Sequence, residues 1–335
     1  MAKIVLGLAT AHTPLLALAS EEWEYRARAD RANTRLALSD GRFVSYPQLL
    51  SEVGPRYQDD ITPEALARKS AQCGAALDRL ADALQKARPD VVVIIGDDQL
   101  ELFGPANQPA IAIFHGAAVP MMDRAHDTSR PQWMHDVHTA YLMDGAHKVP
   151  GSPSFALELI KGLIDRAIDL SICDRVDVEP RKAGCGHAVG FVVKRLLRDR
   201  SIPVVPILLN TYFPPNVPTP ARCYDIGVAL RQVIEGSAAD LRVAVVASGG
   251  LSHFVVDEDL DRGVLAAIEA GASEPLRRIP RSALNSGSSE ILNWVMAAGV
   301  LNGYPVKSVE YYPLRRTEAG TGVGAGFVVW GAKSF

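Results

Sequence analysis

The chain has 335 residues, of which 48% are hydrophobic and 22% are charged, and its formal net charge is −3. This is the composition of an ordinary globular protein with enough apolar material for one large core. The nearly balanced charge argues against nucleic acid as a partner. Because no stretch of about 20 apolar residues occurs, we expect no membrane span. The simplest organisation is one domain over residues 1–335.

The N-terminal segment and the spacing of the cysteines both indicate a protein that is not secreted. The apolar start of the chain is interrupted by His12 and Pro14, which predicts a buried strand rather than a signal peptide. The four cysteines are widely scattered and form no C-x-x-C pair. In a chain of this size such spacing is typical of reduced thiols in a cytoplasmic protein, and it argues against a structural zinc site.

Short runs rich in β-branched residues predict strands at several points along the chain. Since these runs are continuously apolar rather than alternating, we expect strands that are covered on both faces. Helical patterns separate and follow them, and together they predict an α/β fold in which helices cover a central sheet. The expected strands are residues 4–6, 91–95, 111–114, 204–209 and 243–246, and the expected helices are residues 63–86, 153–167, 187–198, 220–235, 257–270 and 287–300.

Two stretches lack a clear periodic pattern. Residues 24–60 are charged and carry the turn signal Asp40-Gly41, and residues 115–152 are rich in His, Met, Pro and Asp. We expect both to be irregular loops or lids over a site.

Polar residues follow directly after several of the expected strands, where α/β proteins place their ligand sites. His12 follows the first strand, Asp97-Asp98-Gln99 follow the second and His253 follows the last, while His187 and Glu290 begin helices. Each has a simpler interpretation: a hydrogen-bonded histidine at a strand end, a turn cap, or an acid favoured by a helix dipole. Taken one at a time, none of them establishes a site.

Together, three segments carry a family resemblance. They are Ser-Gly-Gly-Leu-Ser-His ending at His253, Ala-His-Thr-Pro-Leu-Leu around His12, and residues 210–227, which begin Asn-Thr-Tyr-Phe-Pro-Pro. In this order, and over residues 3–300, the chain resembles the class III extradiol (LigB-like) ring-cleavage dioxygenases of the protocatechuate 4,5-dioxygenase β-subunit type. The resemblance implies the LigB-like layered α/β fold.

The resemblance also implies a site and its chemistry. The family binds one Fe(II) through two histidines and a glutamate and leaves positions open for a catechol and O₂. Carried over, His12 is the first ligand and Glu290 is the carboxylate ligand. His187 and His253 flank the substrate, with His253 as the acid and base and His187 orienting a substrate hydroxyl or bound oxygen. The family also implies a homo-oligomer, or a hetero-oligomer with a related subunit.

One position departs from the family pattern. The second histidine ligand is expected within residues 96–103, but this segment contains no histidine, and Gln99 stands in its place. Asp98 or Gln99 could supply an oxygen ligand to Fe(II) or Mn(II), or His115 could reach the site. Alternatively the metal is lost, which leaves a metal-free lyase or hydrolase on a related aromatic or enol substrate, or a non-catalytic partner subunit.

The leading hypothesis is therefore a non-haem metal-dependent dioxygenase that cleaves a catecholic or aminophenolic ring with O₂. The substrate itself cannot be deduced from the sequence. Trp133 and residues 115–138 are candidates for the pocket wall. Five arginines could bind a substrate carboxylate, although each is also typical of a solvated surface: Arg26, Arg28, Arg31, Arg181 and Arg222.

Overall fold

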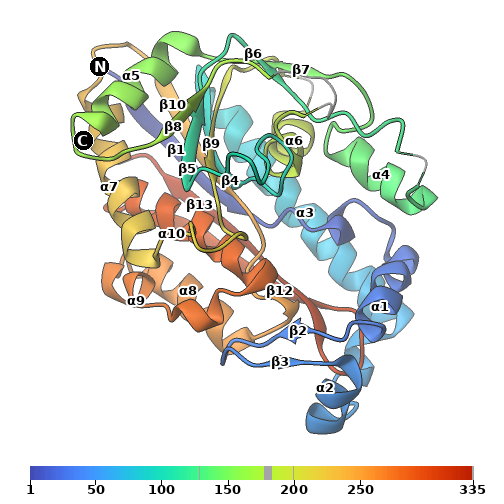
Figure 1. Cartoon of the computed structure of the whole chain (residues 1–335). Coiled ribbons are helices and arrows are strands. Elements are labelled where there is room, and N and C mark those ends of the chain that lie inside the picture. Colours follow the sequence, from blue (N-terminus) through green and yellow to red (C-terminus); the bar gives the residue numbers. More distant parts are fainter. Residues whose placement is uncertain (128, 177–182, 199, 334–335) are drawn as a thin grey trace.

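A mixed β-sheet runs through the centre of the computed structural model, which describes residues 1–127, 129–176, 183–198 and 200–333 (Figure 1). Within these residues the sheet has nine strands, in the order β11-β13-β1-β10-β4-β9-β5-β8, with β12 on the other side of β13. All five expected strands belong to it, so that prediction is confirmed. The strands are β1 (Lys3–Thr10), β4 (Val91–Asp97), β5 (Ile111–Phe114), β8 (Ser171–Cys173), β9 (Val204–Leu209), β10 (Arg242–Ser248), β11 (His253–Val255), β12 (Val306–Arg315) and β13 (Thr321–Gly331).

The direction of the strands decides where the site can form. Strands β1, β10, β4 and β9 run parallel, whereas β13 runs antiparallel to β1 and β5 runs antiparallel to β9. The register pairs Thr10 with Ser248 and Ala247 with Ile95. The carboxyl ends of β1, β10 and β4 therefore meet at one edge of the sheet, and the residues that follow them are neighbours.

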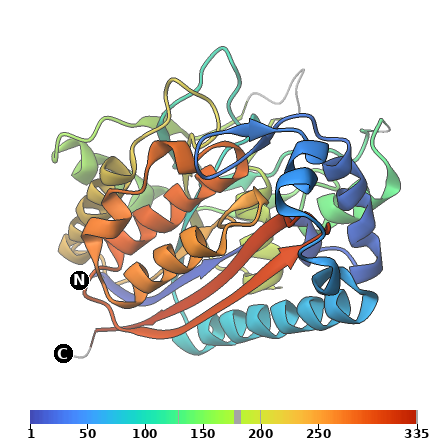
Figure 2. The ribbon, with the colours of Figure 1, turned by 90° about the horizontal axis from the view of Figure 1, so that it is seen from below.

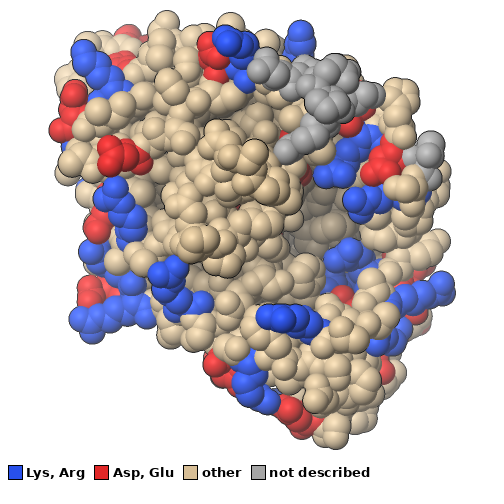
Figure 3. Space-filling model, in the orientation of Figure 1, with Lys and Arg blue, Asp and Glu red and all other residues tan. Residues whose placement is uncertain are grey.

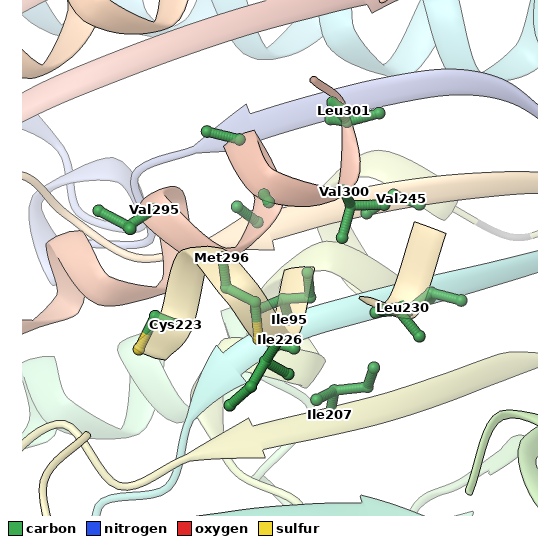
Figure 4. Packing of buried hydrophobic residues seen from close by; sticks show 14 of the residues in the cluster. Ile95, Ile207, Cys223, Ile226, Leu230, Val245, Val295, Met296, Val300 and Leu301 are labelled. Atoms are coloured by element: carbon green, nitrogen blue, oxygen red, sulfur yellow. The ribbon is translucent and has the colours of Figure 1, made fainter. Parts of the chain in front are cut away.

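Helices cover both faces of the sheet. On one face lie α5 (Pro153–Ile164), α7 (Pro220–Gly236), α8 (Glu258–Glu269), α9 (Ser273–Arg277) and α10 (Ile291–Val300). Figure 4 shows Met296 and Val300 of α10, together with Ile226 and Leu230 of α7, packed near Ile95, Ile207 and Val245 of the strands.

The opposite face carries the long helix α3 (Pro63–Ala87) and α6 (His187–Phe191), which continues as a π-helical segment over Val192–Leu197. Figure 2 shows α3 below strands β12 and β13 and the C-terminal helices above them. Every strand residue from Val91 to Ile95 is buried, as expected for a sheet covered on both sides. No helix in the described part of the chain is long and apolar enough to cross a membrane.

The expectation of irregular structure in two stretches was wrong. Residues 24–60 contain most of α1 (Trp23–Arg31), the hairpin of β2 (Leu36–Ala37) and β3 (Phe43–Val44), and α2 (Tyr46–Val53). Ser45 and Gln48 form a reciprocal capping box at the start of α2. This Ser-x-x-Gln pattern is a helix-start signal, but the prediction of irregular structure rested on the many charged residues of the stretch instead. Residues 115–152 contain β6 (Ala118–Pro120), α4 (Gln132–Ala140) and β7 (Lys148–Pro150).

The C-terminal hairpin of β12 and β13 was not anticipated, because glycine is depleted from ordinary strands. Strand β13 contains glycine at alternate positions from Gly322 to Gly326. At Gly324 a β-carbon would overlap the carboxylate of Asp261, which packs against this strand from α8. The glycine reflects this close approach rather than a break in the strand.

Candidate metal centre

Four side chains that can bind a metal gather at the carboxyl edge of the parallel strands. They are His12, Asp97, His187 and Glu290, and one potential ligand atom from each lies within 4.8 Å of all the others. His12 follows β1, Asp97 ends β4, His187 begins α6 and Glu290 ends a 3₁₀ helix that leads into α10. Two imidazoles and two carboxylates form a donor set that suits divalent transition metals.

His12 offers a buried nitrogen atom toward this cluster. Its Nδ1 lies 3.0 Å from the hydroxyl of Ser248, and its backbone carbonyl accepts a hydrogen bond from the hydroxyl of Tyr141. Its Nε2 lies 3.1 Å from Oε2 of Glu290, but this buried atom has no hydrogen-bond partner. Because buried polar atoms are normally satisfied, the imidazole has the orientation expected of a metal ligand.

Glu290 is the centre of the cluster. Its Oε2 accepts a hydrogen bond of 2.7 Å from the backbone amide of Gly250, and its Oε1 lies 3.3 Å from Nε2 of His253 and 3.4 Å from the hydroxyl of Tyr212. Burial acts to raise the pKa of Glu290, but the charges of His253 and His12 outweigh it and hold the pKa well below its usual range. Glu290 is thus a carboxylate, the form that binds cations.

Asp97, rather than Asp98, supplies the second carboxylate of the cluster. Asp97 lies two residues after Ile95, and alternate residues of a strand share a face, so it points toward α10. There its Oδ1 accepts a hydrogen bond of 3.1 Å from the side-chain amide of Asn293. Burial and the charge of Glu290 raise the pKa of Asp97, while His187 opposes the shift. The carboxylates of Asp97 and Glu290 repel each other. A bound cation would relieve this repulsion, so Asp97 is a suitable metal ligand.

Gln99, which stands where the family resemblance predicts a histidine ligand, lies beside Asp97 and Glu290. Its Nε2 donates hydrogen bonds to Oδ2 of Asp97 at 2.9 Å and to Oε1 of Glu290 at 3.2 Å. Asp98 instead accepts hydrogen bonds from the backbone amides of residues 102–103, at 2.7 and 3.2 Å, as a turn-forming aspartate does. The structure therefore brings Gln99, but not Asp98, to the four clustered side chains.

His187 is held by a carboxylate of its own. Its Nδ1 and its backbone amide both contact Oε1 of Glu101, at 2.7 and 3.1 Å. Burial acts to lower the pKa of His187, but Glu101, with Asp97 and Glu290, raises it to about 10. His187 is therefore a protonated hydrogen-bond donor whose Nε2 lies at the edge of the cluster, 3.9 Å from Oδ2 of Asp97.

The close approach of Glu101 to His187 depends on Gly186, where a β-carbon would overlap the Glu101 carboxylate. We expect Gly186→Ala to displace this carboxylate and to lower the free energy of unfolding by about 1–3 kcal/mol. Gly263→Ala in α8 is the matched control, because nothing lies within 4 Å of the added methyl group there, and it should raise stability by about 0.4–1 kcal/mol. Urea denaturation of both variants checks this, and equal stabilities would contradict it.

His253 lies next to Glu290 at the start of β11. Its Nδ1 donates a hydrogen bond of 2.8 Å to the carbonyl of Leu251, and its backbone amide donates to the hydroxyl of Ser288 at 2.9 Å. Burial acts to lower the pKa of His253, but Glu290 and the Leu251 carbonyl raise it. Since Nδ1 is engaged, Nε2 is the atom that can exchange a proton with a ligand.

His115, considered as a replacement ligand, lies far from this cluster in the sheet. It follows β5, which is separated from β4 by β9, and its backbone amide donates a hydrogen bond of 2.7 Å to the carbonyl of Cys173 at the end of β8. Because β5 and the edge strand β8 lie on the far side of β9 from β1 and β10, His115 neither joins the cluster nor lines the cavity beside it.

The cluster opens into a cavity of about 260 Å³. A cavity of about 150 Å³ binds benzene, so this one has room for a substituted aromatic ring. His253, Tyr212 and Phe254 line it beside the cluster. Trp133, a candidate from the sequence, is not among the lining residues, but five other residues of the 115–138 segment contribute to the wall: Arg124, Arg130, Met134, Val137 and His138.

His138 makes this wall sensitive to pH. Burial and the charge of Arg124 lower the pKa of His138 to about 4, whereas an unfolded histidine titrates near ~6.5. The folded chain therefore binds fewer protons between these values, and the free energy of unfolding falls as the pH drops through this window. We expect this to cost about 2 kcal/mol. Denaturation of the wild type and His138→Gln at about pH 7 and about pH 4.5 tests this, and an identical pH dependence would contradict it.

Sequence reasoning missed Glu101 and Asn293, and within the run of residues 97–99 it chose Asp98 or Gln99 as the oxygen ligand where the structure brings Asp97 into the cluster. Strand periodicity could have separated Asp97 from Asp98, because only Asp97 shares the face of Ile95. Nothing in the sequence pairs Glu101 with a histidine 86 residues away, or Asn293 with a strand-end aspartate.

The chain is similar in sequence to known proteins. The family model described as the catalytic LigB subunit of aromatic ring-opening dioxygenase matches residues 47–324, so the segment around His12 lies outside that match. Gallate dioxygenase of Pseudomonas putida is 48% identical over 62 residues, 18% of each chain. The 2,3-dihydroxyphenylpropionate/2,3-dihydroxicinnamic acid 1,2-dioxygenase of Cupriavidus necator is 28% identical over 194 residues, 58% of this chain and 52% of the relative.

A protein of the same name from Xanthobacter autotrophicus is 35% identical over 98 residues, which are 29% of this chain and 28% of that one. These alignments span about half or less of the length of each relative. The family model, in contrast, covers most of the chain and includes Gln99, His187, His253 and Glu290. By that match, the chain belongs to the family of the catalytic LigB subunit of aromatic ring-opening dioxygenases.

Proposed function

We propose that this chain is a non-haem metal-dependent dioxygenase that opens the ring of a catecholic or aminophenolic compound beside its hydroxyl group. In this reaction one ring C–C bond breaks, and both atoms of O₂ enter the product, so no external reductant is needed. The observation that carries the proposal is the buried group of His12, Asp97 and Glu290 beside a ring-sized cavity.

We assign metal binding to His12, Glu290 and Asp97, with Gln99 as a neighbouring oxygen donor after a half-turn of its amide. The unpartnered Nε2 of His12 and the ionised Glu290 support this choice. We assign the ligand role to Asp97 instead of Asp98, because the carboxylate of Asp98 caps a turn. One imidazole with carboxylate and amide oxygens suits Fe(II) or Mn(II). Fe(II) bound there would acidify the substrate hydroxyls and provide positions for substrate and O₂.

The two remaining histidines handle protons. Nδ1 of His253 is bound to the Leu251 carbonyl, so its Nε2, which lies 3.3 Å from Oε1 of Glu290, is the atom that would accept a hydroxyl proton and later return it. His187 is fixed through Nδ1 by Glu101 at 2.7 Å, so its Nε2–H can donate to a substrate or oxygen atom. These assignments separate the metal ligands from the acid-base groups.

Oxygen uptake by protein loaded with Fe(II) under argon and then exposed to air with a panel of catechols and aminophenols tests the proposal. We expect O₂ consumption in equal amount to the substrate cleaved. A loaded sample that holds no metal and consumes no O₂ with any member of the panel would refute it. Full turnover under argon with a chelator would instead support a metal-free lyase or hydrolase.

We further propose that the chain works as a homo-oligomer or with a related subunit, as the family resemblance implies. Light scattering coupled to size-exclusion chromatography measures the homo-oligomer directly. Activity that appears only after a second, histidine-complete chain is added would identify this chain as a partner subunit.

A further inference from the structure

Among the described residues, no acidic side chain forms an ion pair with Arg26. It lies on α1 and lines the same cavity as His12 and Glu290. Within the described residues its side chain makes no hydrogen bond or salt bridge, and its Nε is buried without a partner. Its guanidinium carbon instead lies 6.0 Å from the ring centre of Trp133 and 5.9 Å from that of Phe254. The two aromatic rings hold the guanidinium in place while its donors stay unused.

Arg316 stands beside it and is only half satisfied. Its side chain is buried, and its Nε donates a hydrogen bond of 2.8 Å to Oδ2 of Asp30. Its Nη2, however, is buried without a partner. Burial lowers the pKa of Arg316, and the charge of Arg26 adds to this effect while Asp30 opposes it. The Asp30 carboxylate pairs with Arg316, and within the described residues no ion pair balances Arg26, so this partly desolvated wall carries an unpaired positive charge.

Such an arrangement is costly unless an anion completes it, because an unpaired buried charge loses its hydration without compensation. The other arginines that the sequence offered as carboxylate binders differ. Arg28 and Arg31 both pair with Glu24, and Arg222 on α7 is exposed. Arg181 lies outside the described residues. Figure 3 shows Lys and Arg side chains around the hollow between the regions of α1 and α4.

The position of this pair relates it to the chemistry. Phe254, which packs on Arg26, follows His253 in the chain, and Arg316 also lines the cavity. A ring placed beside Glu290 and His253 could therefore direct one substituent toward the two guanidinium groups. A planar carboxylate is the substituent that matches two guanidinium forks.

We propose that Arg26 and Arg316 form an anion subsite that selects substrates carrying a carboxylate on the aromatic ring or its side chain. This inference rests on the proposed ring-cleaving function, and it assigns the specificity of the same cavity. Carboxylated catechols and aminophenols are then favoured over their neutral counterparts.

Binding measured under argon tests the subsite without requiring turnover. The probes are two matched pairs: 3,4-dihydroxybenzoate with its methyl ester, and 3-(2,3-dihydroxyphenyl)propanoate with its methyl ester. Calorimetric titration of the iron-loaded protein gives the ratio of the dissociation constants of ester and acid. We expect the wild type to bind at least one acid about 10- to 100-fold more tightly than its ester.

Arg26→Met is expected to remove this preference by weakening the binding of the acid far more than that of its ester, and Arg26→Lys should keep part of the preference. Arg28→Met, on the same helix and with the same loss of charge, should retain the full preference. Circular dichroism verifies that each variant is folded, which is expected because the Arg26 side chain has no ion pair to lose. Wild-type protein without any acid preference, or Arg26→Met with an unchanged preference, would overturn the proposal. Selective acid binding without oxygen uptake would leave the subsite in place and reject the dioxygenase function instead.

Discussion

Replacing Glu290 with glutamine is expected to abolish tight metal binding and to lower ring cleavage by more than about 100-fold. The substitution keeps the size of the side chain and an oxygen that can accept from the Gly250 amide. It removes the negative charge that faces His12 at 3.1 Å and His253 at 3.3 Å. Because a carboxylate attracts a divalent cation far more strongly than an amide does, metal affinity is the property that should change most.

The measurement is metal content after dialysis, together with oxygen uptake under saturating substrate. Glu310→Gln is the matched control. Glu310 lies on the partly exposed strand β12 and pairs with Arg79 of α3, so this substitution should leave both the metal content and the oxygen uptake unchanged. Unfolding by urea separates a site effect from a loss of structure. A Glu290→Gln protein that keeps its metal would exclude Glu290 as a ligand.

Gln99→His is expected to strengthen metal binding by about 10- to 100-fold, a comparable effect in the opposite direction. The Gln99 amide nitrogen lies 2.9 Å from Oδ2 of Asp97 and 3.2 Å from Oε1 of Glu290. An imidazole at this position would supply a second neutral nitrogen ligand beside His12, and nitrogen ligands favour transition metals over Mg²⁺ and Ca²⁺. The selectivity for Fe(II) over Mg²⁺ should therefore rise with the affinity.

Competition titrations with Fe(II) and Mg²⁺ measure both effects. Gln99→Ala is the control that removes the amide without adding a ligand, and it should weaken binding if the Gln99 oxygen takes part. If Gln99→His binds Fe(II) no better than the wild type, then position 99 does not reach the metal and Asp97 alone completes the set with His12 and Glu290. Catalysis need not follow affinity, so the dissociation constant is the quantity that decides.

Sequence patterns were sufficient for the architecture where a local signal exists. The apolar runs at residues 91–95 and 204–209 predicted strands β4 and β9, because fully buried strands need no alternation. The proline at the start of α3 and the X-Pro step after it marked that helix to within a residue or two. Local signals failed for β13, where glycines permit the close packing of Asp261 rather than ending a strand.

The sequence by itself determined the fold class, the family and the segments that meet at the edge of the sheet, since these depend on periodicity and on short motifs. Only the tertiary structure decided which side chains face one another there. Asp97 rather than Asp98 turns toward Glu290. Gln99 donates hydrogen bonds to both Asp97 and Glu290, and Glu101 orients His187. Arg26 and Arg316, 290 residues apart, share one buried wall. Such contacts depend on strand order and on side-chain direction, which long-range packing sets and no local pattern encodes.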